Sequence, residues 1–167
     1  MSAWATTVRS PVGVLDLTAD DDGAVTHLLF DVEQPWDSAW WNLRHDPRPF
    51  VDVVAQLEEY FAGERTQFDV PLAPRGTAFQ RAAWEALRAI PYGRTSSYVA
   101  QARAIGRPSA ARAVGAANGR NPIAIVQPCH RVVGASGSLT GYGGGLDRKR
   151  WLLEHERRHV TARLPTA

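Results

Sequence analysis

The chain has 167 residues, 44% of them hydrophobic, and a formal net charge of +2 at neutral pH. This length and composition allow a buried core in one domain or in two small ones. The single cysteine excludes an internal disulfide and a zinc site made of several thiolates. Because no apolar run approaches the length of a membrane span and the first residues do not resemble an export signal, we expect a cytoplasmic protein that contacts no membrane.

The two halves of the chain carry opposite charges. Residues 1–74 contain four arginines against thirteen acidic residues, a net charge of −9. Residues 75–167 contain fourteen arginines and one lysine against four acidic residues, a net charge of +11. Because arginine grips phosphate groups bidentately, the second half predicts a nucleic-acid-binding surface. Mutual neutralisation of the two halves is the alternative interpretation.

The first half, residues 1–74, predicts a small α/β domain. Two strands are expected at residues 12–18 and 25–32, joined by a turn at the Asp-Asp-Asp-Gly sequence of residues 20–23. Apolar residues then recur at helical spacing until Gly63. This spacing predicts a helix that buries Phe50, Val53, Val54, Leu57 and Phe61.

Other stretches of this half have weaker patterns. Residues 31–48 show no clear period and are interpreted as a connecting segment, although they contain Trp36, Trp40 and Trp41. Residues 67–72 favour one more strand. Residues 73–76, Ala-Pro-Arg-Gly, are the expected linker to a second domain, residues 75–167.

The second half begins with the signature of a helix start. Thr77, with Gln80 three residues later, predicts a capping box. The helix that follows should end at residues 91–93, Pro-Tyr-Gly, and should bury Phe79, Ala83, Leu87 and Ile90.

Two short helices are expected next. Thr95 or Ser96 should cap the first, which ends at Ile105 before a turn at residues 106–108. Ser109 should cap the second, which runs over residues 110–118. Two short helices around a tight turn that contains glycine predict a helix-turn-helix.

The second of these helices has an unusually small surface, because Arg112 is its only long side chain. A major-groove recognition helix normally carries several polar side chains to the base edges, so we expect no sequence-specific readout. Small residues with one arginine suit entry into the minor groove and insertion beside a base turned out of the stack. Close packing against a neighbouring helix is the alternative use of such a surface.

Cys129 lies within the sequence Asn121-Pro-Ile-Ala-Ile-Val-Gln-Pro-Cys-His-Arg-Val-Val133, directly before a histidine and an arginine. Cationic neighbours lower the pKa of a thiol, and the thiolate is the reactive form, so Cys129 is a candidate nucleophile. Pro128 at the first position of a helical turn would place the sulfur at the positive end of a helix dipole. An unreactive, buried cysteine is the alternative.

This sequence resembles the active-site segment of the O6-alkylguanine-DNA alkyltransferases, also called methylated-DNA–protein-cysteine methyltransferases, whose signature is Pro-Cys-His-Arg in an apolar run. Other stretches are similar to this family in order and spacing, namely residues 76–98, 105–115, 141–145 and 149–156, and more loosely 10–13 and 60–63. The resemblance implies an α/β N-terminal domain, ribonuclease-H-like with a small sheet and a helix. A mainly α C-terminal domain with a winged helix-turn-helix should follow.

The resemblance also implies a catalytic set. Cys129 would be the nucleophile and alkyl acceptor, His130 the base that draws the thiol proton through a water, and Glu156 the carboxylate that orients His130. Asn121 would brace the turn between the recognition helix and the active-site strand. Tyr98 would meet guanine N3 and the adjoining phosphate. From the residues alone, Tyr98 favours a core tyrosine and Glu156 a solvated surface acid.

Substrate and DNA contacts are implied in the same way. Tyr142 and Gly143 match the loop that covers the base, and backbone carbonyls near Cys129 and Val132 would accept the guanine amino group. Arg112 matches the arginine that fills the space left by a flipped base. The remaining DNA-facing residues would be Ser109, Ala110, Ala113 and Ala117, together with Tyr98.

The implied activity is DNA repair with double-stranded DNA containing alkylated guanine as the partner. The base, chiefly O6-methylguanine and more weakly O4-methylthymine, would be flipped out, and its alkyl group would pass irreversibly to Cys129. A thioether cannot be hydrolysed by any group of this sequence, so each molecule should act once. We expect no cofactor, no metal and a monomer in solution, with self-association along DNA left open.

Three other classes of function remain open. A Cys-His hydrolase would use the same thiolate but would turn over. A DNA-binding regulator would use the helix-turn-helix without the thiol, although the alanine-rich second helix argues against base reading. A binder that recognises the lesion without transfer would lack the nucleophile, which is present here as Cys129.

The sequence departs from the family pattern at two residues. Gln127 stands where the strand before Pro128 usually has an apolar residue, and Arg103 lies where the first helix of the motif is usually apolar or neutral. Gln127 leaves the packing of that strand in question but not the chemistry.

Overall fold

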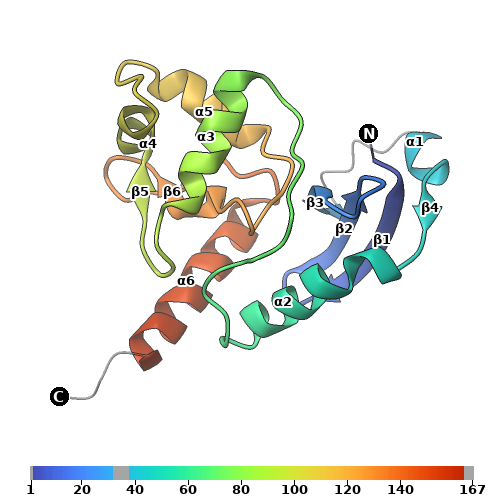
Figure 1. Cartoon of the computed structure of the whole chain (residues 1–167). Coiled ribbons are helices and arrows are strands. Elements are labelled where there is room, and N and C mark those ends of the chain that lie inside the picture. The colour runs from blue at the N-terminus through green and yellow to red at the C-terminus, as the bar shows by residue number, and fades with distance from the viewer. Residues whose placement is uncertain (1, 32–37, 164–167) are drawn as a thin grey trace. The chain divides into compact units, whose positions relative to one another are not determined.

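A computed structural model describes residues 2–31 and 38–163, and the chain divides into two compact units. Unit 1 comprises Met1–Arg75 with Pro122–Ala124, and unit 2 comprises Gly76–Asn121 with Ile125–Ala167. Unit 1 is a small sheet with helices, and unit 2 is mainly helical (Figure 1). This confirms the expected fold class.

Unit 1 is built on a four-stranded sheet in the order β3-β2-β1-β4. Strands β1 (Trp4–Ser10), β2 (Gly13–Ala19) and β3 (Val25–Phe30) form an antiparallel meander. The two predicted strands correspond to β2 and β3. In the turn between them, the Asp20 carboxylate accepts hydrogen bonds from the backbone N–H groups of Asp22 and Ala24.

The sequence did not predict strand β1, since only Ala5 of its seven residues is fully buried and most of the others are polar. In the segment expected to be irregular, the described part contains a short helix α1 (Ser38–Trp41) and strand β4 (Arg44–His45), which pairs with β1 in parallel. Trp36 lies outside the described residues. The strand expected at residues 67–72 is wrong, because only Leu72 makes a β-bridge there, to Val25.

The predicted helix of unit 1 is α2 (Val51–Phe61), preceded by a short 3₁₀ turn (Arg48–Phe50). It lies along the sheet (Figure 1) and buries Val53, Leu57 and Tyr60. A second segment reaches unit 1 from far along the chain. The Leu28 N–H donates to Pro122 O at 2.9 Å, and the Ala124 N–H donates to Leu28 O at 2.9 Å, so residues 122–124 lie beside β3.

Unit 2 begins with helix α3 (Ala78–Arg88), and its capping box is confirmed. Gln80 N–H donates to Thr77 Oγ1 at 3.1 Å, and Thr77 N–H donates to Gln80 Oε1 at 2.9 Å. The helix buries Ala83, Trp84 and Leu87, and the Trp84 indole N–H donates to the backbone of the later helix α5 (Ala111–Gly119).

Replacing Thr77 with alanine should therefore lower the free energy of unfolding by about 1 kcal/mol, because one of the first N–H groups of α3 loses its acceptor. Denaturant titration of the wild type and the variant measures this difference. An unfolding free energy unchanged within about 0.3 kcal/mol would contradict the contribution that we assign to the cap.

The helix-turn-helix consists of α4 (Tyr98–Ala104) and α5, as predicted, but the caps of both helices differ from the prediction. The cap of α4 is Ser97, because Ser96 and Ser97 form the short strand β5 (Ser96–Ser97), which pairs with β6 (Val132–Val133). The N-cap of α5 is Ala110, whose methyl group cannot accept a hydrogen bond, so the predicted Ser109 cap is wrong.

The rest of unit 2 places the cysteine segment between two helices. After α5 the chain passes through residues 122–124 and returns in a 3₁₀ turn, Cys129–Arg131, followed by β6. A loop at residues 134–145 then leads into the long helix α6 (Leu146–Arg163). No helix in the part of the chain that the structure describes is long and apolar enough to cross a bilayer.

Candidate active site and DNA-binding surface

Cys129 is held by two consecutive turns. Pro128 has φ −81° and ψ 68°, and the Cys129 N–H donates to Gln127 O at 2.8 Å, which together form an inverse γ-turn. Cys129 is then the first residue of the 3₁₀ turn. The prediction that Pro128 occupies the first helical position is therefore wrong, and a turn of three residues adds little helix dipole at the sulfur.

The sulfur of Cys129 accepts a hydrogen bond from Asn121. Asn121 Nδ2 lies 3.2 Å from Cys129 Sγ and also donates to the backbone oxygen of Gln127 at 2.7 Å. The Gln127 side chain returns a hydrogen bond from Nε2 to Asn121 Oδ1 at 2.9 Å. Asn121, expected to brace the turn, thus also contacts the candidate nucleophile directly, because the chain folds back on itself between these residues.

Glu156, on helix α6, is buried and forms hydrogen bonds with the imidazole of His130 and the guanidinium of Arg131. It is 1% exposed, and its Oε1 lies 2.7 Å from His130 Nε2. Arg131 Nε lies 2.9 Å from both carboxylate oxygens, and Arg131 Nη1 donates to Ile90 O at 2.7 Å. The structure therefore brings Glu156 and His130 together, and Arg131 is a partner that the sequence analysis did not assign.

The ionisation of Glu156 reflects two opposing effects. Burial raises the pKa of the carboxyl group, but the charge and hydrogen bond of His130, together with those of Arg131, outweigh burial and lower the pKa to about 2. Glu156 is therefore ionised across the physiological range. Because the carboxylate accepts from His130 Nε2, the other ring nitrogen, Nδ1, is left without a hydrogen-bond partner among the described residues.

A pocket of about 250 Å³ opens beside the sulfur. The sequence had assigned Tyr98, Cys129, Tyr142 and Gly143 to the site, and all four line this pocket, together with Gly115, Asn118, Gly119 and Gly141. Gly115 lies beside the Tyr98 ring in the pocket wall, where a Cβ atom would be 3.6 Å from the ring, in ordinary van der Waals contact. The described side chains can thus surround a planar ligand next to a thiol.

Two polar side chains near the pocket were not found from the sequence. Thr140 Oγ1 lies 2.6 Å from the Tyr98 hydroxyl, and the backbone oxygen of Thr140 accepts from Lys149 Nζ at 3.1 Å. Lys149 is 1% exposed, and burial lowers the pKa of its ammonium group whereas the charge of Cys129 raises it. Lys149 is the single lysine of the chain and begins the family-like stretch of residues 149–156, but the sequence assigned it no role.

Val132 lies in the core rather than among the pocket-lining residues. It is fully buried and packs with Trp84 and Leu87 in a cluster against which Tyr98 and Cys129 lie. The cluster therefore supports one side of the site.

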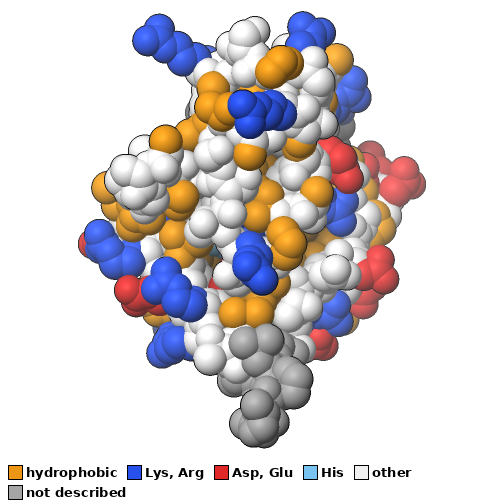
Figure 2. Space-filling view, turned by 90° about the vertical axis from the view of Figure 1, so that its left-hand side faces the viewer, with side chains coloured by type: hydrophobic (Ala, Val, Ile, Leu, Met, Phe, Trp, Pro, Cys, Tyr) orange, Lys and Arg blue, Asp and Glu red, His pale blue; other side chains and the backbone are white. Residues whose placement is uncertain are grey.

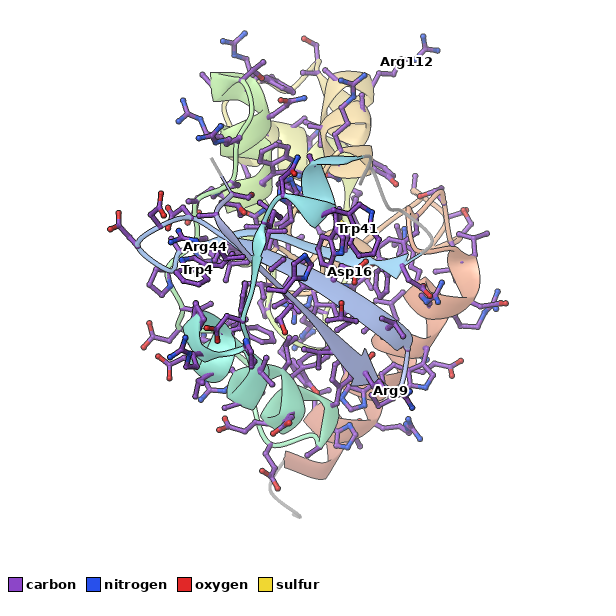
Figure 3. The ribbon with its side chains drawn as sticks, turned by 90° about the vertical axis from the view of Figure 1, so that its right-hand side faces the viewer. Trp4, Arg9, Asp16, Trp41, Arg44 and Arg112 are labelled. Carbon is purple, nitrogen blue, oxygen red and sulfur yellow. The ribbon has the colours of Figure 1, made fainter. Side chains whose placement is uncertain are left out.

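The outer surface of α5 provides the candidate DNA contact. Ser109, Arg112 and Ala113 are exposed, and Ala110 is half-buried. Figure 3 shows Arg112 extending away from the ribbon at the end of unit 2. Ala117, expected on the same surface, is 2% exposed and its backbone oxygen accepts from Trp84 Nε1 at 2.7 Å, so it lies in the interior instead.

The surface of unit 2 is basic, as its composition predicts. Figure 2 views the molecule from the side of α4 and α6 and shows basic side chains distributed over this face, with apolar side chains between them and acidic ones toward the edges; because Lys149, the one lysine, is buried, the basic side chains are arginines. Such a surface suits a polyanion.

Among residues 2–31 and 38–163, no group of three or more His, Cys, Asp or Glu side chains could hold a metal ion.

These features define a class of protein in which one cysteine, bonded to an asparagine and followed by a buried histidine–carboxylate pair, lies beside a helix-turn-helix with a basic surface. Family comparison agrees with this class. Residues 78–158 match the DNA binding domain of 6-O-methylguanine DNA methyltransferase, and residues 4–74 match the ribonuclease-like domain of the same protein.

Individual relatives cover nearly the whole chain. A methylated-DNA–protein-cysteine methyltransferase of Mycolicibacterium paratuberculosis is 57% identical over 158 residues, which are 95% of this chain and 94% of the relative. One from Methanosarcina acetivorans is 49% identical, over 89% of this chain and 94% of the relative.

Solved structures give the same result. The crystal structure of Mycobacterium tuberculosis O6-methylguanine methyltransferase has a TM-score of 0.87 and 51% identity, over 100% of this chain and 97% of that one. A structure of the tuberculosis protein in complex with DNA has a TM-score of 0.87 and 53% identity, over 94% of both chains. The present chain belongs to the methylated-DNA–protein-cysteine methyltransferase family.

Proposed function

We propose that this enzyme repairs double-stranded DNA by taking an alkyl group from O6 of guanine onto its own Cys129, in a single irreversible turnover. The observation that carries the proposal is the pocket beside Cys129, which combines the thiol with Tyr98 and the Tyr142–Gly143 loop. O6-methylguanine is the principal substrate, and O4-methylthymine is a weaker one. No cofactor takes part, because the nucleophile, the base and the alkyl acceptor are all side chains of the chain itself.

The first step is the formation of the thiolate. His130 Nδ1 receives the thiol proton through a water, while Glu156 accepts from Nε2 and stabilises the imidazolium that forms. Asn121 Nδ2 donates to the sulfur and stabilises its negative charge. Lys149, buried nearby, adds a positive charge that interacts with Cys129.

The second step is displacement at the alkyl carbon. The sulfur forms a bond to this carbon while the carbon–O6 bond breaks, and the guanine departs with the bonding electron pair. Its developing charge requires hydrogen-bond donors, which the Tyr98 hydroxyl supplies at N3 and a backbone N–H of the Tyr142–Gly143 loop at O6. Thr140 Oγ1, at 2.6 Å, can donate to the Tyr98 oxygen and so support this role. The product is a thioether at Cys129.

The base reaches the pocket by rotation out of the duplex. The start of α5 and the two residues before it enter the minor groove with the small side chains of Ser109, Ala110 and Ala113, and Arg112 fills the space that the base leaves. All of these groups come from one copy of the chain. We therefore infer an enzyme that acts as a monomer in solution.

The direct test is transfer of a labelled methyl group from O6-methylguanine in duplex DNA to the protein, followed by mass mapping of the labelled residue. We expect one label per molecule, on Cys129. A label on another residue would refute the assignment of the acceptor. Hydrolysis of model esters with repeated turnover would instead indicate a Cys-His hydrolase.

Replacing Arg112 with alanine should separate base flipping from chemistry. The variant should repair duplex DNA about 10- to 100-fold more slowly, because the extruded base is no longer replaced in the stack. Its reaction with free O6-benzylguanine should change little, since a free base needs no extrusion. Rates on both substrates should be compared with those of Arg81→Ala, which removes an exposed arginine from α3. Equal losses on both substrates would indicate a structural role for Arg112.

A further inference from the structure

Gln127 is a buried polar residue without a role in the mechanism above. It is 2% exposed and lies two residues before the nucleophile. A glutamine amide that is buried without partners is costly, so its hydrogen bonds indicate what it does. Its side-chain Nε2 donates to Asn121 Oδ1 at 2.9 Å, and its backbone oxygen accepts from Asn121 Nδ2 at 2.7 Å.

These two bonds determine which way the Asn121 carboxamide faces. With Oδ1 bonded to Gln127 Nε2, the Nδ2 group is directed to Gln127 O and to Cys129 Sγ, 3.2 Å away. A carboxamide rotated by half a turn would place Oδ1 against both the Gln127 backbone oxygen and the sulfur. That arrangement would repel a thiolate, whereas the observed one stabilises it.

The same bonds close a strained loop. Between Asn121 and Gln127 the chain contributes residues 122–124 to unit 1 and then turns at Ile125, which has a φ of +70°. A β-branched residue in the left-handed region is strained and persists only where its surroundings hold it. The Asn121–Gln127 bonds join the two ends of this loop. They therefore keep the Asn121 amide within hydrogen-bond distance of the Cys129 sulfur.

We propose that Gln127 is a positioning residue for alkyl transfer, which orients Asn121 so that its amide donates to Cys129 and lowers the pKa of the thiol. The inference rests on the proposed function, because it assumes that the Cys129 thiolate is the reacting species. It assigns a use to the one residue of the active-site segment that departs from the apolar pattern of the family. Gln127 acts only through Asn121.

Because Cys129 is the only cysteine, its titration can be measured directly from the pH dependence of its reaction with iodoacetamide. Gln127→Met removes the donor and keeps the side-chain length, and it should raise the thiol pKa by about 0.5 unit. Gln127→Glu replaces the donor with a carboxylate, which attracts Asn121 Nδ2 and rotates the carboxamide. Its shift should be larger, about 1 unit or more.

The background variant is Asn121→Ala, which removes the group through which Gln127 acts. Gln127→Met made in this background should shift the thiol pKa by less than about 0.2 unit, because coupled residues are not additive. The matched control is Gln101→Met. Gln101 is 3% exposed and exchanges two hydrogen bonds of 2.8 Å with Asn118, so it tests the loss of a hydrogen-bonded amide pair between α4 and α5 that does not include Asn121.

The rate of labelled-methyl transfer is measured in parallel as a function of pH. In Gln127→Met the rate should fall at neutral pH and recover toward the wild-type value at high pH, where the thiol ionises without help. An unchanged thiol pKa in both Gln127 variants would overturn the proposal. A shift that persists in the Asn121→Ala background, or an equal shift in Gln101→Met, would also overturn it. Failure of the proposed function would appear separately. In that case the Cys129 thiol pKa would respond to the Gln127 variants as expected, but the wild-type protein would acquire no methyl label.

Discussion

Replacing Cys129 with serine should abolish alkyl transfer completely while the protein still binds alkylated duplex DNA. Serine is nearly isosteric and can accept the same hydrogen bond from Asn121 Nδ2, but its hydroxyl stays protonated and is a far weaker nucleophile. Labelled O6-methylguanine DNA should leave no label on the variant. Its duplex affinity, measured by fluorescence anisotropy, should remain within about threefold of the wild type, since 0.6 kcal/mol corresponds to that factor.

Two outcomes would contradict this expectation. Transfer that survives in Cys129→Ser would place the acceptor on another residue. A loss of duplex affinity together with activity would mean that the serine disturbs the fold near α5, and thermal unfolding of the variant would then reveal the disturbance.

Replacing Glu156 with glutamine should reduce both stability and activity. The variant leaves Arg131 and His130 without their carboxylate in a buried site, which should cost about 3 kcal/mol of unfolding free energy. Alkyl transfer should slow by about 10²-fold, because His130 loses the group that orients it and stabilises its cation. The matched control is Glu154→Gln, which removes an exposed carboxylate two residues away on the same helix.

The pH dependence of stability provides an independent measurement on the same carboxylate. Its pKa is about 2 in the folded protein and 4.5 ordinarily, so the unfolded chain binds the proton more readily. The stabilisation from Glu156 is therefore fully present above about pH 4.5 and is lost as the pH falls toward 2. Denaturant titrations should show that the wild type loses about 3 kcal/mol more than Glu156→Gln over this window. Parallel curves for the two proteins would show that Glu156 is not preferentially ionised in the folded state.

The fold could be predicted from the sequence where local patterns are strong. The capping box at Thr77 corresponds to the observed start of α3, and the helical spacing before Gly63 corresponds to the observed end of α2. Strand β1 was missed because its residues are mostly polar and show no apolar alternation. It is held in the sheet by antiparallel pairing with β2, which the sequence of β1 alone does not reveal. The cap of α4 was misplaced because the β5–β6 pair delays the start of this helix. The cap of α5 was misplaced because this helix begins at Ala111, one residue later than predicted.

The candidate site shows the same division between local and distant interactions. The sequence by itself determined the chemistry: one cysteine, the histidine and arginine after it, and a family pattern around them. It could not show that Gln127 and Asn121 bond to each other, that Thr140 reaches Tyr98 across 42 residues, or that Ala117 lies inside. Glu156 is the clearest case. Its helix has the composition of a solvated one, and only the packing of α6 against the 3₁₀ turn at Cys129 buries the carboxylate beside His130 and Arg131. Reactive groups are encoded in neighbouring residues, whereas their ionisation and orientation depend on burial and on partners that only the tertiary structure brings within hydrogen-bond distance.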